Sequence, residues 1–239
     1  THRLNSPTQI LEQYWGYKEF RESQIPIVDS VMSGNSILAI LPTGGGKSIC
    51  YQVPGMSLRG VTLVISPLIS LMADQVKNLI DRGIEAVYLH SGLTRHEEDV
   101  ILNDVVRDQY DFLYISPERL KNRLFKARFH DMPINLVVVD ECHCISQWGH
   151  DFRPAYRNIM EVREYSHDIQ IVAFTATATD QVQRDIKELL AINEVFKSST
   201  YRENLIYSVA KIEDKIGRIK ERSLQDPTHS GIVYVRNRK

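Results

Sequence analysis

The sequence is poor in cysteine and has no long apolar run. Its 239 residues include three cysteines, Cys50, Cys142 and Cys144. An odd number without a regular spacing argues against the disulfide framework of a small secreted domain. No apolar run approaches the roughly 20 residues that cross a bilayer, and no signal peptide opens the chain. We therefore expect no membrane partner and a reducing compartment, the cytoplasm or a nucleus.

An excess of charge of one sign is also missing. The chain has 29 Lys and Arg against 30 Asp and Glu, a net charge of −1. This balance does not indicate a nucleic-acid partner, but it does not exclude one. Internal repeats and low-complexity segments are absent as well. With 43% apolar and 25% charged residues, the composition is that of a globular protein with one buried core and material for part of a second.

Short apolar runs alternate with helical patterns along most of the chain. The runs are rich in Val, Ile and Leu on both faces, which is typical of parallel strands covered by helices on both sides. We therefore predict an α/β fold with a doubly wound, mainly parallel sheet. The predicted strands span 36–41, 61–66, 85–89, 112–115, 134–140 and 170–175, with a possible last strand in 194–200. The predicted helices begin at Ser6-Pro7 and span 47–52, 68–82, 94–109, 117–125, 154–165 and 179–190.

The pattern changes near residue 200. Lys and Arg outnumber the acids after this point, whereas the acids outnumber them before it. A strand, a helix and a strand are predicted over 205–209, 214–224 and 231–235. A segment of about 40 residues buries too little surface to fold alone. Either this segment joins the first sheet, or the chain is a piece of something longer; the change in composition indicates a boundary near residue 200.

The strongest local signal is the stretch 36–48, SILAILPTGGGKS. It predicts a buried strand, a loop whose backbone N–H groups surround a phosphate, and a helix whose N-terminus faces that phosphate. Leu41 stands where the P-loop pattern has its first glycine. Lys47 is expected to reach the β- and γ-phosphate oxygens, and the Ser48 hydroxyl to ligate Mg²⁺. The residues predicted to bind the phosphates are Thr43, Gly44, Gly45, Gly46, Lys47 and Ser48.

Two acids follow the apolar run 136–139. The run places Asp140 at the carboxyl edge of a strand, where parallel sheets bind ligands. Asp140 is predicted to hold Mg²⁺ through water, and Glu141 to act as general base on the attacking water. Two acids after a strand are common, but downstream of a phosphate loop they indicate a nucleoside triphosphatase.

The stretch 142–154, CHCISQWGHDFRP, follows these acids directly. A zinc site is not expected, because three consecutive candidate ligands do not converge easily on one tetrahedral ion. Trp148, His150, Phe152 and Arg153 combine aromatic and cationic groups, which suits stacking on unpaired bases and contact with phosphates. The alternative is that Trp148 and Phe152 pack together under the sheet and have no role in binding.

Two further segments have two interpretations each. The segment 17–24, YKEFRESQ, is either the start of an amphipathic helix or a clamp for a nucleotide base. In a clamp, Tyr17 stacks on the base and Gln24 contacts its purine edge. After the predicted strand 170–175, Thr175 and Thr177 either bridge the acids to a moving part or help to cap the next helix.

These motifs together resemble the RecQ family of superfamily 2 DNA helicases. The resemblance rests on GYKEFRESQ, LPTGGGKS, SPLISLMADQV, YISPERL, VVDECHCISQWGHDFRPAY and FTATAT, and covers essentially the whole chain. The aromatic-rich loop directly after the DECH box is its most specific part. The resemblance implies a RecA-like fold, ATP and Mg²⁺ as cofactors and no zinc in this segment. It also implies single-stranded and partly duplex DNA as partner, for 3′-to-5′ translocation and unwinding in DNA repair and recombination. We expect a monomer that is nucleoid-associated in a bacterium or nuclear in a eukaryote.

The resemblance also implies roles for individual residues. Tyr17, Arg21 and Gln24 correspond to the adenine-recognition motif. The catalytic set is Lys47, Asp140, Glu141 and His143. The residues implied in DNA binding or in its coupling to ATP are Ser66, Pro67, Ser116, Arg119, Gln147, Trp148, His150, Phe152, Arg153, Thr175 and Thr177.

The resemblance implies that residues 1–200 form one RecA-like domain and that residues 201–239 begin a second one. The stretch 202–205, RENL, resembles the family's R-P-N-L entry into a second RecA-like domain, with Glu203 in place of Pro. The stretch 231–235, GIVYV, resembles the first motif of that domain. The arginine finger of that domain is not in this sequence, so we expect ATP binding with weak hydrolysis. The alternative is an ATP-binding regulatory module without motor activity. A P-loop kinase or GTPase would explain neither the aromatic loop nor the segment 17–24.

Overall fold

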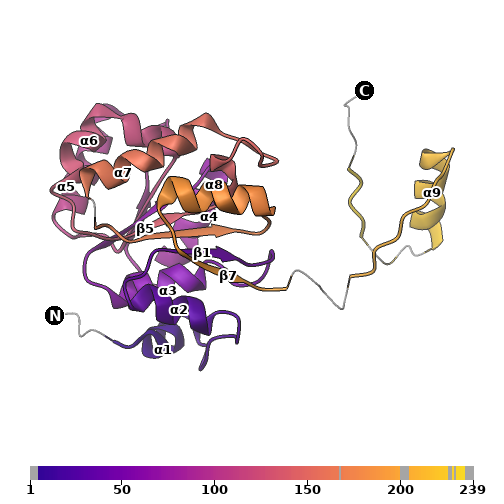
Figure 1. Cartoon of the computed structure of the whole chain (residues 1–239), viewed down its shortest axis with the longest axis horizontal. Helices are drawn as coiled ribbons and strands as arrows, with labels where there is room; N and C mark the ends of the chain where they lie inside the picture. Colours follow the sequence, from indigo (N-terminus) through magenta and orange to yellow (C-terminus); the bar gives the residue numbers. More distant parts are fainter. Residues whose placement is uncertain (1–4, 167, 200–204, 226–227, 229, 235–239) are drawn as a thin grey trace. The chain divides into compact units, whose positions relative to one another are not determined.

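Figure 1 shows a computed structural model of the chain, which describes residues 5–166, 168–199, 205–225, 228 and 230–234. The chain divides into two units, Thr1–Thr200 and Tyr201–Lys239. This division falls where the charge balance changes. That the second unit begins another RecA-like domain stays a prediction. Within the described residues, no helix has the length and apolar character needed to cross a membrane.

The first unit is built on a parallel sheet. Over the described residues, seven strands lie in the order β3-β4-β2-β5-β6-β1-β7, and every pair is parallel. The strands are β1 (Ile37–Ile40), β2 (Val61–Ile65), β3 (Ala86–Tyr88), β4 (Phe112–Ile115), β5 (Ile134–Val139), β6 (Ile171–Thr175) and β7 (Glu194–Lys197). All the predicted strands of this unit are present. The predicted doubly wound α/β fold is confirmed.

Helices cover both faces of this sheet, and Figure 1 shows α2 and α3 on one side and α6 and α7 on the other. The α-helices are α1 (Pro7–Ile10), α2 (Ile25–Met32), α3 (Ile49–Ser57), α4 (Ile69–Ile80), α5 (Arg95–Val106), α6 (Arg123–Phe129), α7 (Met160–Tyr165) and α8 (Asp180–Leu190). A π-helical turn, η1 (Leu11–Trp15), follows α1. The 3₁₀ helices are η2 (Pro117–Lys121), η3 (Cys142–Ile145) and η4 (Pro154–Ile159).

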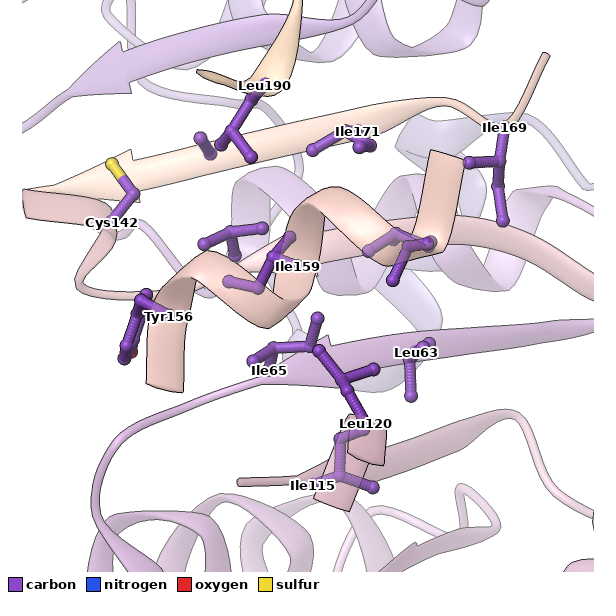
Figure 2. Close-up of a cluster of buried hydrophobic side chains, with 14 of the residues drawn as sticks. Leu63, Ile65, Ile115, Leu120, Cys142, Tyr156, Ile159, Ile169, Ile171 and Leu190 are labelled. Carbon is purple, nitrogen blue, oxygen red and sulfur yellow. The ribbon is translucent and has the colours of Figure 1, made fainter. Parts of the chain in front are cut away.

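The core consists of one apolar layer on each face of the sheet. Successive side chains of a strand point to opposite faces. Ile37 of β1 therefore belongs to the apolar cluster on the side of α2, α3 and α4, whereas Leu38 belongs to the cluster on the side of α5 to α8. Figure 2 shows part of the second layer, where Ile159 of η4 lies among side chains that include Ile65 and Ile171 of the sheet. Burial on both faces explains why the strands read as continuous apolar runs.

Local signals set most helix boundaries. The predicted start at Ser6 is a capping box in which Ser6 and Gln9 exchange hydrogen bonds. Two predicted helices are each a 3₁₀ helix followed by a short α-helix, η2 with α6 and η4 with α7. The first break occurs because Asn122 leaves the helical conformation and its Oδ1 accepts from the N–H groups of Leu124 and Phe125, which starts α6.

In the second unit only the predicted helix forms. Helix α9 (Lys215–Gln225) begins beside Asp214, whose Oδ1 accepts from Gly217 N at 2.8 Å. The predicted strand 205–209 is wrong, and no strand forms in 231–234; residue 235 lies outside the described residues, as do Arg202, Glu203 and Asn204. A strand needs a neighbour for its backbone hydrogen bonds, and none is present within this unit's described residues. Ile206 is accordingly 96% exposed.

Candidate active site

The predicted site residues meet at the carboxyl edge of the sheet. In the strand order β1 lies beside β6, and β6 beside β5. Ile40 at the end of β1 is in register with Thr175 at the end of β6. Leu41 N then donates to Thr175 O at 3.1 Å. The glycine loop, the two acids after β5 and the threonines after β6 therefore share one edge, where parallel sheets bind ligands.

Two glycines of the loop between β1 and α3 have no room for a side chain. Gly46 has φ +78°, in the left-handed region, and a Cβ there would lie 2.3 Å from Nε2 of Gln24. At Gly45 a Cβ would lie 2.8 Å from the Pro42 oxygen. Only bare backbone fits these positions, and such backbone can approach a phosphate closely. The loop thus fits a nucleotide phosphate.

The segment 17–24 is bound to this loop and is not the start of a helix, since α2 begins at Ile25. Arg21 Nη1 donates to Gly44 O at 2.8 Å, and Gln24 Nε2 donates to Gly46 O at 3.2 Å. Gln24 Oε1 accepts from Arg21 N at 2.9 Å, and its side chain is buried. Tyr17 is 55% exposed, which leaves its ring accessible for stacking. These contacts favour the clamp interpretation, whereas adenine recognition itself stays a prediction.

Lys47 and Asp140 bring opposite charges to the site. Lys47 Nζ lies 3.4 Å from Leu41 O. Burial first, and the Glu141 charge second, raise the pKa of Asp140 to about 6; the Lys47 ammonium is close enough to oppose this shift. A buried carboxylate next to another acid gains from a nearby cation.

The donor set at this edge fits Mg²⁺. Ser48 supplies a hydroxyl and Asp140 a carboxylate, and oxygen ligands are those that Mg²⁺ prefers. A bound Mg²⁺ ion would lower the electrostatic cost of ionising the Asp140 carboxyl. Elsewhere, the described residues contain no group of three or more His, Cys, Asp or Glu arranged to hold a metal ion. Cys142 and Cys144 are both buried in the apolar core.

Glu141 has an unusual backbone conformation. Its φ of 47° and ψ of 45° lie in the left-handed region, which is uncommon for residues other than glycine and often marks a functional site. The Glu141 backbone makes two hydrogen bonds in this conformation: its N donates to the side-chain Oδ1 of Asp140 at 3.0 Å, and its O accepts from Cys144 N at 3.0 Å. The turn brings the Glu141 carboxylate to within reach of His143.

His143 connects the acids to the end of β6. Its Nδ1 lies 2.9 Å from Thr175 Oγ1 and 3.3 Å from Glu141 Oε2. The Thr175 hydroxyl donates to Thr177 O at 3.0 Å, so Thr175 Oγ1 must accept from Nδ1. This fixes the proton of the neutral ring on Nδ1. Burial lowers the pKa of His143, which favours that neutral form.

The aromatic loop that follows lies between this site and the segment after β2. The His150 ring stacks on His143 with centroids 4.2 Å apart. Arg153 Nη1 donates to Pro67 O at 3.0 Å, and its guanidinium pairs with Asp151 at 3.1 Å. Trp148 is 73% exposed, so the alternative of a Trp–Phe pair packed under the sheet does not hold.

A pocket of about 330 Å³ opens between these parts. Its walls come from the acid turn, the aromatic loop, the start of α4 and the end of β6. The lining residues are Pro67, Leu68, Leu71, Glu141, His143, Cys144, His150, Asp151, Arg153, Ala176 and Thr177. The general base proposed from the sequence therefore faces the same space as the loop that carries Trp148.

The other residues predicted to contact DNA differ in their exposure and in their hydrogen bonds. Ser66 Oγ is buried and has no hydrogen-bond partner among the described residues. Ser116 precedes η2, and Gln147 is exposed. Arg119 is bound inside the protein, with Nη1 2.8 Å from Glu98 Oε2 and Nη2 2.8 Å from His90 O. A DNA contact by Arg119 stays a prediction, and its guanidinium already has a structural role.

Sequence reasoning missed two buried tyrosines beside the site. The Tyr156 hydroxyl donates to Asp140 O at 2.8 Å and supports the turn that follows β5. Tyr51 is buried in α3, and its hydroxyl lies 3.3 Å from the hydroxyl of Tyr114. The position of Tyr51 three residues after Ser48 on a helix was an available signal, because residues three apart share a helix face. Nothing in the sequence marks Tyr156.

The ligand-free chain is expected to become less stable than an Asp140→Asn variant as the pH rises. The folded chain raises the pKa of Asp140 from 3.8 to about 6, so the carboxyl is neutral in both states below this window. Through the window the unfolded chain loses the proton more readily, and stability is lost with rising pH. Asparagine stays neutral, so the variant should gain about 1–3 kcal/mol relative to the wild type.

Urea unfolding across this pH range, without nucleotide or Mg²⁺, measures the difference. The exposed Asp131→Asn is the matched control and should show no such trend. A stability difference between Asp140→Asn and the wild type that does not change with pH would contradict the raised pKa.

Comparison with known proteins identifies relatives of the chain. Residues 21–186 match the family described as DEAD/DEAH box helicase. The chain is 41% identical to the probable ATP-dependent DNA helicase RecS of Bacillus subtilis, over 97% of the chain and 47% of that protein. It is 44% identical to the ATP-dependent DNA helicase RecQ of the same organism, over 100% of the chain and 40% of that protein. The chain thus spans less than half of these relatives.

Solved structures show the same fold at lower identity. The helicase MrfA has a TM-score of 0.73 with 17% identity, over 98% of this chain and 39% of that one. A hypothetical ATP-dependent RNA helicase from Sulfolobus tokodaii has a TM-score of 0.61 with 20% identity, over 81% of this chain and 57% of that one.

Proposed function

Because the chain belongs to the DEAD/DEAH box helicase family, we propose that it is the ATP-binding part of a RecQ-like DNA helicase. The resemblance to RecQ helicases that the motifs indicated is confirmed by the similarity to proteins of that name. In this proposal the chain binds ATP with Mg²⁺ and hydrolyses it. Hydrolysis drives 3′-to-5′ movement along single-stranded DNA and the unwinding of duplex DNA, in repair and recombination.

The nucleotide is held by the edge of the sheet described above. Backbone N–H groups of the glycine loop and the Lys47 ammonium bind the phosphates, and Tyr17, Arg21 and Gln24 form the base side of the site. Ser48 and Asp140 hold Mg²⁺, which when bound neutralises charge on the phosphate oxygens. The Glu141 carboxylate orients the attacking water and accepts its proton.

The observation that carries the proposal is the position of His143. Its Nδ1–H reaches the base Glu141 and Thr175 at the same time. Its ring also stacks on His150 of the aromatic loop. If DNA displaces this loop, the movement is passed to the Glu141 carboxylate through two contacts, that of His150 with His143 and that of His143 with Glu141. Exposed Trp148 offers a face on which an unpaired base can stack, and Arg153 ties the loop to Pro67, beside the buried Ser66.

The remaining features are finer proposals on the same basis. Single-stranded and partly duplex DNA is the proposed partner, contacted by the aromatic loop and by the segments at Ser66-Pro67 and Ser116. We place the protein with the nucleoid of a bacterium or in a eukaryotic nucleus. Zinc has no proposed role in this segment.

Replacing Trp148 by alanine tests the coupling. The variant is expected to lose most of the stimulation that single-stranded DNA gives to ATP hydrolysis. The reason is that stacking on an aromatic residue is worth about 1–3 kcal/mol per base. The measurement is the rate of phosphate release with and without an oligonucleotide, in the longest form of the protein that can be expressed.

Two controls make this result specific. Lys47→Ala gives the rate of contaminating ATPases, and Met160→Ala removes a side chain that is 41% exposed on α7, away from the site. Full stimulation in Trp148→Ala would contradict the coupling role of the loop. ATP binding without any response to DNA in the wild type would favour the regulatory module instead.

A further inference from the structure

The start of the aromatic loop is hydrogen-bonded to α8. Ser146, directly after η3, is 1% exposed, and its Oγ lies 2.5 Å from Asp185 Oδ2 on α8. The Trp148 N–H donates to the same Ser146 Oγ at 3.1 Å. One buried hydroxyl thus joins a carboxylate on α8 to the backbone of the exposed tryptophan. Neither Ser146 nor Asp185 has a role in the site as described so far.

The donors and acceptors of this contact can be assigned. An ionised carboxylate only accepts, so the single hydroxyl hydrogen of Ser146 goes to Asp185. The Ser146 oxygen keeps its lone pairs for the Trp148 N–H. Hydrogen bonds from a hydroxyl to a carboxylate are short, about 2.5–2.7 Å, and about twice as strong as those between neutral groups. The contact with α8 is therefore of the stronger kind.

Asp185 is in turn held on its own helix. Gln181, one turn earlier, donates from Nε2 to Asp185 Oδ1 at 2.9 Å. The Gln181 Oε1 accepts from Arg184 Nη2 at 2.8 Å, which fixes the orientation of the amide. Val182 and Ile186 of the same helix are buried in the core. Each carboxylate oxygen of Asp185 thus has its own partner, and the helix that carries it is packed on the sheet.

The turn that carries Trp148 has little room to adjust. Gly149 N donates to Ser146 O at 3.1 Å, and a Cβ at Gly149 would lie 2.5 Å from His143 O. At its other end the loop is hydrogen-bonded to the segment after β2 through Arg153. The loop is therefore held at both ends, and Trp148 lies between them.

We propose that Asp185 is a positioning residue for the aromatic loop. It holds Ser146, and through Ser146 the backbone of Trp148, in the conformation that presents the indole ring to single-stranded DNA. The inference rests on the proposed function, because it concerns the same loop. A loop that is already ordered loses less conformational entropy when it binds. Without Asp185 the DNA itself must order the loop, so more DNA is needed for the same effect.

The test measures ATP hydrolysis against the concentration of a single-stranded oligonucleotide, in the longest form of the protein that can be expressed. Asp185→Ala is expected to raise the concentration that gives half-maximal stimulation by about tenfold, the effect of one lost hydrogen bond to a charged group. At saturating DNA it should reach the wild-type maximum, whereas Trp148→Ala lowers the maximum itself. Asp185→Asn keeps an oxygen that accepts from Ser146, and should raise the half-maximal concentration by only about threefold.

Further variants separate the contact from the charge. Glu188→Ala removes an exposed acid from the same helix and should leave the half-maximal concentration unchanged. If the Asp185 charge only repelled DNA, its removal would lower that concentration instead of raising it. Adding Asp185→Ala to Ser146→Ala should cost little more than Ser146→Ala alone, because the contact is already broken.

A measurement without DNA separates this inference from the proposed function. Hydrogen exchange of the backbone amides in 146–149 reports the local order of the loop. It should be faster in Asp185→Ala than in the wild type and unchanged in Glu188→Ala. A wild type whose loop is protected in this way, but whose ATP hydrolysis does not respond to DNA, would contradict the proposed function.

Two results would overturn the inference. One is an Asp185→Ala variant with the half-maximal concentration of the wild type, and the other is unchanged hydrogen exchange in 146–149. If Asp185→Ala does not fold, Asp185→Asn decides by the same two measurements, and wild-type values in both would overturn the inference.

Discussion

Replacing Glu141 by glutamine is expected to lower the rate constant of ATP hydrolysis by about 10²- to 10⁴-fold, the usual contribution of a general base. The amide cannot accept a proton from water. It has the same shape as the carboxylate, and its oxygen can still accept from His143 Nδ1, which lies 3.3 Å from Glu141 Oε2. The fold and the affinity for ATP should therefore be kept.

Single-turnover hydrolysis, started with ATP already bound, measures this loss without interference from binding. Titration of a fluorescent nucleotide shows that affinity is retained. Glu164→Gln, an exposed acid next to the end of α7, is the matched control. A Glu141→Gln variant that hydrolyses ATP as fast as the wild type would show that another group is the base.

Replacing Gly46 by alanine is expected to weaken ATP binding by about tenfold to a hundredfold. An alanine with φ +78° is strained, and its Cβ would lie 2.3 Å from Gln24 Nε2. Left-handed strain costs on the order of 1–3 kcal/mol, and each 1.4 kcal/mol is about tenfold in affinity. The loop must also push Gln24 away, so the segment 17–24 loses one of its two hydrogen bonds to the loop.

Two comparisons separate strain from contact in this variant. Gly34 has φ +85° and no atom within 4 Å of its added Cβ, so Gly34→Ala carries strain alone and is remote from the site. It should lower thermal stability and leave ATP affinity unchanged. Combining Gly46→Ala with Gln24→Ala removes the contact and should recover part of the stability. If Gly46→Ala bound ATP as tightly as the wild type, the claim that the loop has no room for a side chain at this position would be wrong.

Much of the fold could be predicted because it depends on local patterns. A strand buried on both faces is apolar along most of its length, and β2 and β5 are read from this property although each has one polar residue, Thr62 and Asn135. The glycine loop and the acids after β5 could be placed for the same reason. Strand, loop and helix each leave a separate signal, and the parallel topology brings the strand ends together.

The remaining features depend on contacts that no local pattern encodes. Arg119 pairs with Glu98 on α5, a helix that comes earlier in the chain. The left-handed conformation of Glu141 depends on the neighbouring turn and not on its residue type. The strand predicted at 205–209 has suitable apolar residues but no partner for its backbone in the described part of its unit. Sequence patterns indicate what a segment can form, and tertiary contacts decide whether it does.

The exposure of Trp148 gives the protein an optical probe of its own. The sequence has two tryptophans, and the other, Trp15, is half-buried with the Arg82 guanidinium 5.8 Å from its ring. Indole fluorescence depends on solvent contact, so in a Trp15→Phe background the emission comes from the aromatic loop alone. The wavelength and quenching of this emission then report the solvent exposure of the loop during each turnover, without any attached dye.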